Sequence, residues 1–356
     1  MTDRDVAELT AAVQRNCDLA DAAYAQDLSL CTYLLQMREF FRWERGLPLQ
    51  APPDRGEVGR WIASREAHWE SLADASESSF APLPIADGVD AFDEGAANAR
   101  LAPSGLVYAA GLGRFRRPEF MLAERLASHA REGAIILVTG REHARGMNPP
   151  IAVSRGDQVL VRRDVLRRWL GTRIEFSRQR PTAEALGAAL DAWQLGDGDP
   201  QVALDRIADI ETETLILHEL GERRAAGLLG PQWEEMLVSL EAPRAEIVAR
   251  AIRDLLADCL LTLPALLERG AAGSIHFWFA NFEGMRRLLA PALPGAYARW
   301  RAGEPQALSD ALEAGSEHWL AQARRMLAAW QTDASAGVEA LSGELAGVAR
   351  SESPNA

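Results

Sequence analysis

The spacing of apolar residues predicts helices over both ends of the chain. In residues 3–46 apolar side chains recur every three or four positions, which places them on one face of a helix. A Gly-Leu-Pro segment at 46–48 ends this pattern, and a second helix is predicted at 56–72. After Pro181 the helical pattern returns without a fixed repeat, which predicts a bundle. The predicted helices lie near 182–195, 199–227, 231–240, 243–268, 278–290, 294–302 and 305–332.

The period changes in the middle of the chain, where short strands are predicted near 105–162. Residues 134–139 form an apolar run between two glycines, and residues 151–161 form a hairpin pattern around Gly156. We predict a helix over 118–132, because Pro118 suits a first helical turn and the following Gly a helix end. A further short helix is predicted over 164–170.

These patterns predict a mainly α fold with a small α+β insert, short antiparallel strands and a C-terminal helical bundle. Residues 71–99 lose periodicity and hold six acidic residues without a base, which is typical of an acidic linker. The predicted parts are N-terminal helices at 1–70, the linker at 71–100, a basic α+β module at 101–180, the bundle at 181–345 and a frayed tail at 346–356.

Composition limits the classes of protein. Apolar residues make up 48% and charged residues 25% of the 356 positions, which is typical of a globular chain. No apolar run approaches the roughly 18 residues of a membrane span, and the first residues lack the apolar segment of a secretory signal. The three cysteines, Cys17, Cys31 and Cys259, are too scattered for a disulfide framework. We therefore expect a cytoplasmic protein.

All 38 basic residues are Arg, and this excludes several enzyme classes. Without Lys there is no Schiff-base amine and no phosphate-loop lysine, so P-loop NTPases, kinases and pyridoxal-phosphate enzymes are excluded. The G-x-G-x-x-G, G-x-S-x-G, C-x-x-C and H-E-x-x-H motifs are also missing.

Two predicted helices carry the strongest candidate chemistry. On helix 199–227, His218 and Glu222 share a face one turn apart at the edge of the apolar stripe, and Glu219 is predicted to face water. On helix 243–268, Asp258 lies within the apolar sector and Asp254 at its border. Because a buried carboxylate must be paired, protonated or metal-bound, Asp258 marks a site.

Two interpretations of this site remain open. In the first, His218, Glu222, Asp254 and Asp258, with His276, converge on one or two divalent metal ions such as Fe, Mn or Zn. In the second, the arginines of these helices neutralise the aspartates and His218 is a hydrogen-bonded core residue. The candidates for that ionic network are Arg250, Arg253 and Arg286.

A second candidate site is electrostatic. Residues 114–180 hold 15 Arg against seven acidic residues, a charge of +8, so the rest of this −13 chain carries −21. Such asymmetry favours an anionic ligand or an acidic protein partner, unless the basic module docks on the chain's own acidic helices. The candidate anion-binding residues are Arg114, Arg116, Arg117, Arg162, Arg163, Arg167 and Arg168. The negative net charge of the whole chain and the lack of a recognisable nucleic-acid-binding fold argue against nucleic acid.

Three segments resemble an uncharacterised bacterial protein family. They are CTYLLQMREFFRWE at 31–44, LHELGE at 217–222 and ADCLLTLP at 257–264. The resemblance covers nearly the whole chain and implies a bacterial origin, but no mechanism. The leading functional hypothesis is therefore a metal-binding protein, which could be a metal-dependent enzyme, with its site between helices 199–227 and 243–268. The alternative is a non-catalytic interaction protein that binds an acidic partner or phosphorylated ligand through residues 114–180.

Overall fold

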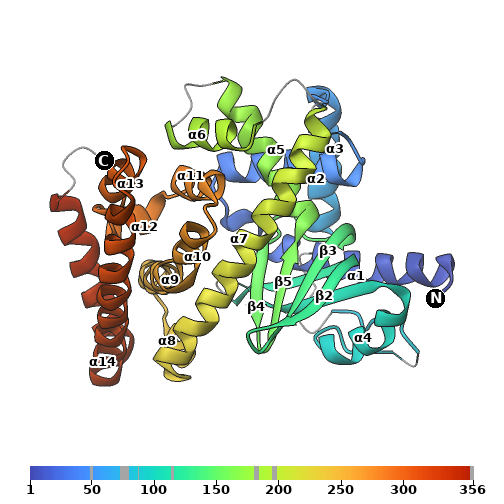
Figure 1. The fold of residues 1–356 in the computed structure, drawn as a ribbon. Helices are drawn as coiled ribbons and strands as arrows, with labels where there is room; N and C mark the ends of the chain where they lie inside the picture. The colour runs from blue at the N-terminus through green and yellow to red at the C-terminus, as the bar shows by residue number, and fades with distance from the viewer. Residues whose placement is uncertain are drawn as a thin grey trace. The chain divides into compact units, whose positions relative to one another are not determined.

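A computed structural model describes most of the chain as helices with one five-stranded sheet (Figure 1). The described residues are 1–48, 51–72, 80–86, 88–113, 116–179, 184–194 and 199–352. They form two compact units. The first unit comprises Met1–His129, Ile136–Ile151 and Leu160–Thr172, and the second Ala130–Ile135, Ala152–Val159 and Arg173–Ala356. The predicted mainly α fold with a small β part is confirmed.

The N-terminal segment forms three helices of the first unit. The pattern over 3–46 is divided between α1 (Asp3–Tyr24) and α2 (Leu30–Glu44), with the short 3-10 turn η1 (Ala25–Asp27) between them. The side chain of Ser29 accepts a hydrogen bond from the backbone N–H of Thr32 at 3.3 Å, which caps the start of α2. The prediction of a helix at 56–72 is confirmed by α3 (Arg55–Glu70).

The acidic segment that follows packs into the first unit, so its interpretation as a linker is wrong for residues 80–86 and 88–99. Leu83 is fully buried, and α4 (Glu94–Leu101) packs beside the sheet before the turn η3 (Ala102–Ser104). The carboxylate of Asp93 caps α4 by accepting from the N–H of Ala96 at 2.9 Å. Of the acidic residues that the structure describes here, Asp90 accepts from the N–H of Phe92 in a turn and Asp93 caps a helix, roles that composition alone does not reveal.

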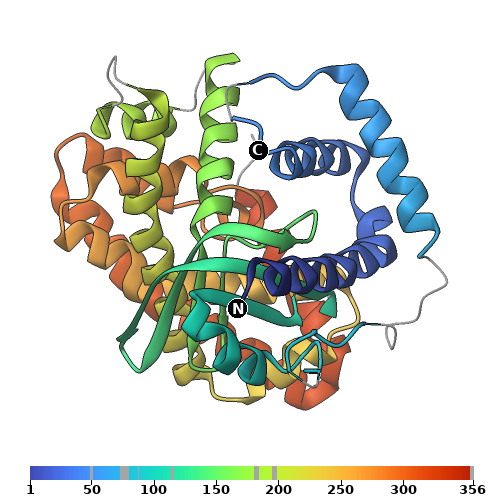
Figure 2. The same cartoon turned by 90° about the vertical axis from the view of Figure 1, so that its right-hand side faces the viewer.

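The sheet is mixed and has the order β1-β2-β3-β5-β4. Its strands are β1 (Leu106–Leu112), β2 (Pro118–Arg131), β3 (Ala134–Arg145), β4 (Ala152–Arg155) and β5 (Gln158–Arg162). Side chains of α1 and α4 form one hydrophobic core with β1, β2 and β3, and Figure 2 shows α1 lying along the sheet. The predicted strand at 134–139 and the hairpin at 151–161 are confirmed, but the expectation of only antiparallel strands is wrong.

The prediction of a helix over 118–132 is wrong, because this segment is the longest strand, β2. Gly133 does adopt a left-handed conformation, with φ +73°, and Glu132 before it has φ +50°. Two consecutive positive φ angles are typical of a two-residue hairpin turn, and they join β2 to β3. Gly133, which the sequence pattern interprets as a helix end, therefore lies in the hairpin turn between β2 and β3.

Helices occupy the rest of the chain, as predicted. The first of them, α5 (Arg163–Gln179), runs past the predicted end at residue 170. The others are α6 (Glu184–Ala192), α7 (Pro200–Leu229), α8 (Gln232–Ser239), α9 (Pro243–Ala257), the π-helical turn η5 (Asp258–Thr262), α10 (Leu263–Glu268), α11 (Ala272–Ala280), α12 (Gly284–Leu289), α13 (Leu293–Arg301) and α14 (Pro305–Glu352). In Figure 1, α9 lies beside the 30-residue helix α7.

The last helix changes the prediction for the C-terminal tail. α14 continues to Glu352, with a kink at Asp333 and Ala334, so residues 346–352 are helical; residues 353–356 lie outside the described part. Among the helices described, none combines the length and the apolar character that crossing a membrane requires.

Candidate metal centre

A glycine brings the two candidate helices together. A Cβ atom added at Gly221 of α7 would lie 2.7 Å from the carbonyl oxygen of Ala257 at the end of α9. Only a residue without a side chain allows this approach. Gly221 lies between His218 and Glu222, so the close contact occurs where α7 carries its candidate ligands.

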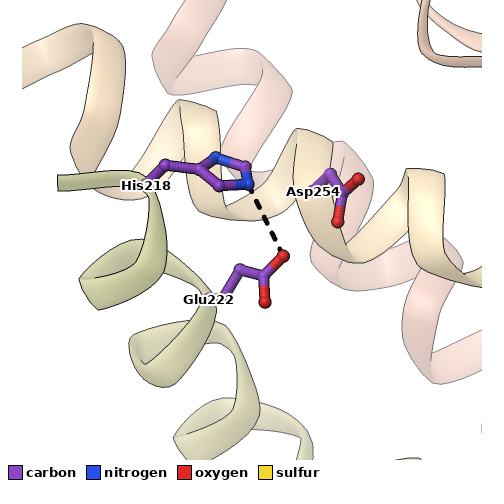
Figure 3. Close-up of side chains that lie close together, drawn as sticks. All are labelled: His218, Glu222 and Asp254. Atoms are coloured by element: carbon purple, nitrogen blue, oxygen red, sulfur yellow. Dashed lines mark ion pairs between the residues drawn. The ribbon is translucent and has the colours of Figure 1, made fainter. Parts of the chain in front are cut away.

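The side chains of His218, Glu222 and Asp254 meet at this contact. One ligand atom from each lies within 4.8 Å of the other two, and Figure 3 shows His218 and Glu222 facing Asp254 across the gap between the helices. Nε2 of His218 lies 3.5 Å from Oε1 of Glu222. The predicted convergence of α7 and α9 at these three residues is therefore present.

Asp258 joins the cluster through the other nitrogen of His218. Nδ1 of His218 donates to Oδ1 of Asp258 at 2.8 Å, and this carboxylate is 1% exposed. Asp258 starts the π-helical turn η5, a local widening of the helix that is frequent at functional sites. The prediction that Asp258 is buried is confirmed, and its position behind His218 fixes the orientation of the ring.

The alternative ionic network is also present in part. Nη1 of Arg286 on α12 lies 3.2 Å from Oδ2 of Asp258. Nη2 of Arg253 lies 2.8 Å from Oε1 of Glu222 and 3.7 Å from Oδ1 of Asp254. Arg250 instead pairs with Glu246 on its own helix at 2.7 Å. Two of the three predicted arginines thus contribute positive charge to the site.

Glu219 was missed by the sequence interpretation. It is buried, so the prediction that it faces water is wrong. Burial and the nearby Glu222 carboxylate raise the pKa of Glu219 to about 8. The helical pattern assumes one buried face for α7, whereas α7 contacts β4 and α11 as well as α9 and η5. In the sequence, the position of Glu219 directly after His218 is the signal that could have indicated its place in the site.

The remaining pKa shifts show the balance of charge at the site. Burial and the Glu222 carboxylate raise the pKa of Asp254 to about 6. Burial opposes charge on Glu222 as well, but Arg253 and His218 hold its pKa well below its usual range. Burial also opposes charge on His218, yet the Asp258 and Glu222 carboxylates hold its pKa well above the usual range. Glu222 is thus ionised beside its cations, whereas Glu219 retains its proton at neutral pH.

His276 does not join this cluster. Its Nδ1 lies 2.8 Å from the hydroxyl of Tyr297, and its ring packs against Trp300 with centroids 5.4 Å apart. Burial and the charge of Arg301 lower the pKa of His276. The expectation that it is a fifth ligand is therefore wrong for this arrangement, because its ring nitrogen is bound to tyrosine.

The candidate anion-binding arginines do not form one site. Arg114 lies outside the described residues, Arg116 is exposed, and Arg117 pairs with Asp27 at 2.9 Å. On the segment 162–168, Arg163 and Arg167 are partly exposed, whereas Arg162 pairs with Glu142 at 2.6 Å and Arg168 with Asp164 at 3.1 Å. Binding of an acidic partner by this segment stays a prediction.

Comparison with known proteins identifies the family. Residues 8–162 match the N-terminal domain, and residues 167–347 the C-terminal domain, of a family of unknown function (DUF6866). The chain belongs to this family. No curated protein and no solved structure matches the chain. The cluster at α7 and α9 lies within the C-terminal family domain.

Proposed function

We propose that the C-terminal domain binds a divalent metal ion between α7 and α9. The ligands are Nε2 of His218 and carboxylate oxygens of Glu222 and Asp254. The observation that carries this proposal is that these three donor atoms lie within 4.8 Å of one another. Donors this close can share one ion at about 2.0–2.2 Å each after small side-chain adjustments.

The hydrogen bond between His218 and Asp258 supports this assignment. Metal-binding histidines commonly donate their second ring N–H to a carboxylate, which fixes the tautomer and makes the other nitrogen a better ligand. Asp258 accepts from Nδ1 at 2.8 Å, and Nε2 is on the side of Glu222. A histidine that only filled space in the core would need one such partner, not a carboxylate at each nitrogen.

The raised pKa values supply an independent argument. Burial and the Glu222 carboxylate raise the pKa of Glu219 to about 8 and that of Asp254 to about 6, so Glu219 keeps its proton at pH 7 while Asp254 is largely ionised. A site with this much carboxylate gains stability from a divalent cation, which takes the place of the retained protons. One imidazole with several carboxylates suits Fe, Mn or Zn.

Arg253 is the competitor of the metal. Its guanidinium binds the same Glu222 oxygen that faces His218, and it also lies 3.6 Å from the exposed Glu234. Metal binding therefore requires Arg253 to release Glu222, and Glu234 is in place to receive it. Because of this competition, we expect metal affinity below that of a site of the same ligands without the arginine.

The test is metal analysis of the purified protein, followed by calorimetric titration of chelator-treated protein with Mn²⁺, Fe²⁺ and Zn²⁺. We expect one saturable site, and about 10- to 100-fold weaker binding in Asp258→Asn because His218 loses its orienting partner. The matched controls are His318→Gln and Glu235→Gln, exposed positions of the same unit, which should bind as the parent does. Absence of saturable binding in the parent overturns the proposal, and so does unchanged affinity in Asp258→Asn.

A further inference from the structure

Three arginines lie together within the first unit and are largely shielded from water. Arg145 ends β3 and is 3% exposed, and Arg162 ends β5 and is 4% exposed. The third, Arg168, lies on α5 and is partly buried. Burial lowers the pKa of Arg145, and the neighbouring charges of Arg162 and Arg168 lower it further. We call these three residues the arginine cluster.

The carboxylates of the cluster are fewer than its cations. Glu142 accepts from Nη1 of Arg145 at 3.5 Å and from Nε of Arg162 at 2.6 Å. Asp164 accepts from Nε of Arg168 at 3.1 Å. Three guanidinium groups thus share two carboxylates, which leaves one positive charge in excess.

Each member also keeps one buried nitrogen without a hydrogen-bond partner among the described residues. These atoms are Nε of Arg145, Nη2 of Arg162 and Nη1 of Arg168. A buried, unpaired donor destabilises the folded state, and more strongly when the group is charged. The cost falls on three arginines of which two are close enough for their charges to act on Arg145, and this favours a common missing acceptor over three separate packing faults.

The acidic residues of α1 nearby already have other partners. Asp18 accepts from Nη1 of Arg65 at 3.1 Å and from the amide of Gln14 at 3.1 Å. Asp21 accepts from the backbone N–H of Met147 at 2.8 Å, and burial raises its pKa to about 7, so a large fraction of it is neutral near pH 7. Neither residue supplies the free negative charge that the arginine cluster needs.

We infer that the arginine cluster binds a small tetrahedral oxyanion of the phosphate class. A phosphate has several oxygens pointing in different directions, and so it can accept from three guanidinium groups at once. A planar carboxylate offers only two oxygens, a role that Glu142 already fills. The guanidinium of Arg145 lies over the rings of Trp43 and Phe40, at 5.2 and 5.9 Å from their centroids, which holds it in place before the anion arrives.

This site is separate in its residues from the proposed metal centre, so either proposal can fail without the other. It uses only Arg162 and Arg168 of the arginines expected from the sequence, and it adds Arg145, which the sequence interpretation did not select. The experiment titrates the full chain with inorganic phosphate at constant ionic strength, by calorimetry and by thermal unfolding, with chloride and succinate as comparison anions.

We expect saturable phosphate binding that raises the melting temperature, and little response to chloride or succinate. The test variant is Arg168→Gln, the least buried member, in which phosphate should bind about tenfold more weakly because one charge-assisted hydrogen bond is lost. Arg15→Gln, at an exposed arginine of α1 in the same unit, removes the same charge and should bind phosphate as the parent does.

Three results overturn the inference: no saturable binding of phosphate by the parent, an equal response to succinate, or unchanged phosphate binding in Arg168→Gln. If Arg168→Gln fails to fold, the parent provides the answer through the side-chain N–H resonances of its arginines. Slowly exchanging Arg N–H signals that shift with phosphate but not with chloride support the site, and signals that ignore phosphate contradict it.

Discussion

The two clusters described above are opposite in charge and built on different backbones. Around His218, carboxylates of α7 and α9 outnumber what their cations neutralise, so Glu219 retains its proton at neutral pH and the pKa of Asp254 is raised to about 6. Around Glu142, guanidinium groups from two strand ends and a helix outnumber their carboxylates, and three nitrogens lack partners. The acidic cluster adapts by holding protons, whereas arginine cannot release one at neutral pH.

This difference shows how each region tolerates an incomplete charge balance. A carboxylate whose charge is unfavourable becomes neutral, so the acidic cluster is stable without its ligand and binds a cation in exchange for protons. The arginine cluster has no such alternative, so its stability depends directly on Glu142 and on any anion it holds.

Glu142→Gln should have the largest effect. It removes the shared acceptor of Arg145 and Arg162, and leaving buried charges unpaired costs about 3–5 kcal/mol of unfolding free energy. Urea denaturation measures this loss, and added phosphate should recover part of it by mass action. The control Glu8→Gln, at an exposed position of α1, should match the parent. A Glu142→Gln protein as stable as the parent would contradict the claim that the arginine cluster depends on its carboxylate.

Gly221→Ala tests the helix contact beneath the acidic cluster. Its Cβ would lie 2.7 Å from the Ala257 carbonyl oxygen, so the helices must separate, at a cost of about 1–3 kcal/mol. Metal affinity should fall as well, because His218 and Asp254 move apart. Gly227→Ala on the same helix meets no atom within 4 Å and should be neutral or stabilising by up to about 1 kcal/mol. Equal stabilities for the two variants would show that the close approach does not matter.

Glu219→Gln should have the smallest effect on the unfolding free energy at neutral pH, because Glu219 is already protonated there. The substitution should instead change how stability depends on pH. The folded state keeps the proton of Glu219 up to a pKa of about 8, while the unfolded state loses it near about 4.3. The stabilisation is therefore fully present below the unfolded pKa, falls by up to about 1.4 kcal/mol per pH unit as pH rises between the two values, and is lost above about 8. In chelator-treated protein, the variant should lose this slope. A slope as steep as the parent's would assign the titration to another group.

The sequence predicts which residues form the acidic site, but not which neighbouring side chains are buried. His218, Glu222 and Asp258 follow from helical spacing and from a carboxylate on an apolar face, and the structure brings them together. The helical pattern places Glu219 on the solvent side, because it assumes a single buried face for α7. Which further faces of α7 are covered depends on tertiary packing, which a single helix pattern does not contain.

The errors in the fold have a similar cause. β2 carries buried residues on consecutive positions from Phe120 to Ala123, so the alternation typical of a strand is hidden there. Its turn at Glu132 and Gly133 uses the same left-handed glycine that ends many helices. Arg145 gave no signal at all, because its partner Arg162 is 17 positions away along the chain and only the pairing of strands brings them together.

Through the π-helical turn η5, a residue outside the acidic cluster affects the orientation of Asp258. The helix that begins at Pro243 continues through η5 into α10, and Pro264 lies in its first α10 turn. Proline has no N–H and its ring crowds the preceding turn, so a regular α-helix would be disrupted there. The π-helical turn absorbs this irregularity, with the N–H of Leu263 bonded to the carbonyl of Asp258, five residues back. The direction of successive side chains around the helix axis therefore shifts at this turn, so a proline outside the cluster helps to set where the Asp258 carboxylate points.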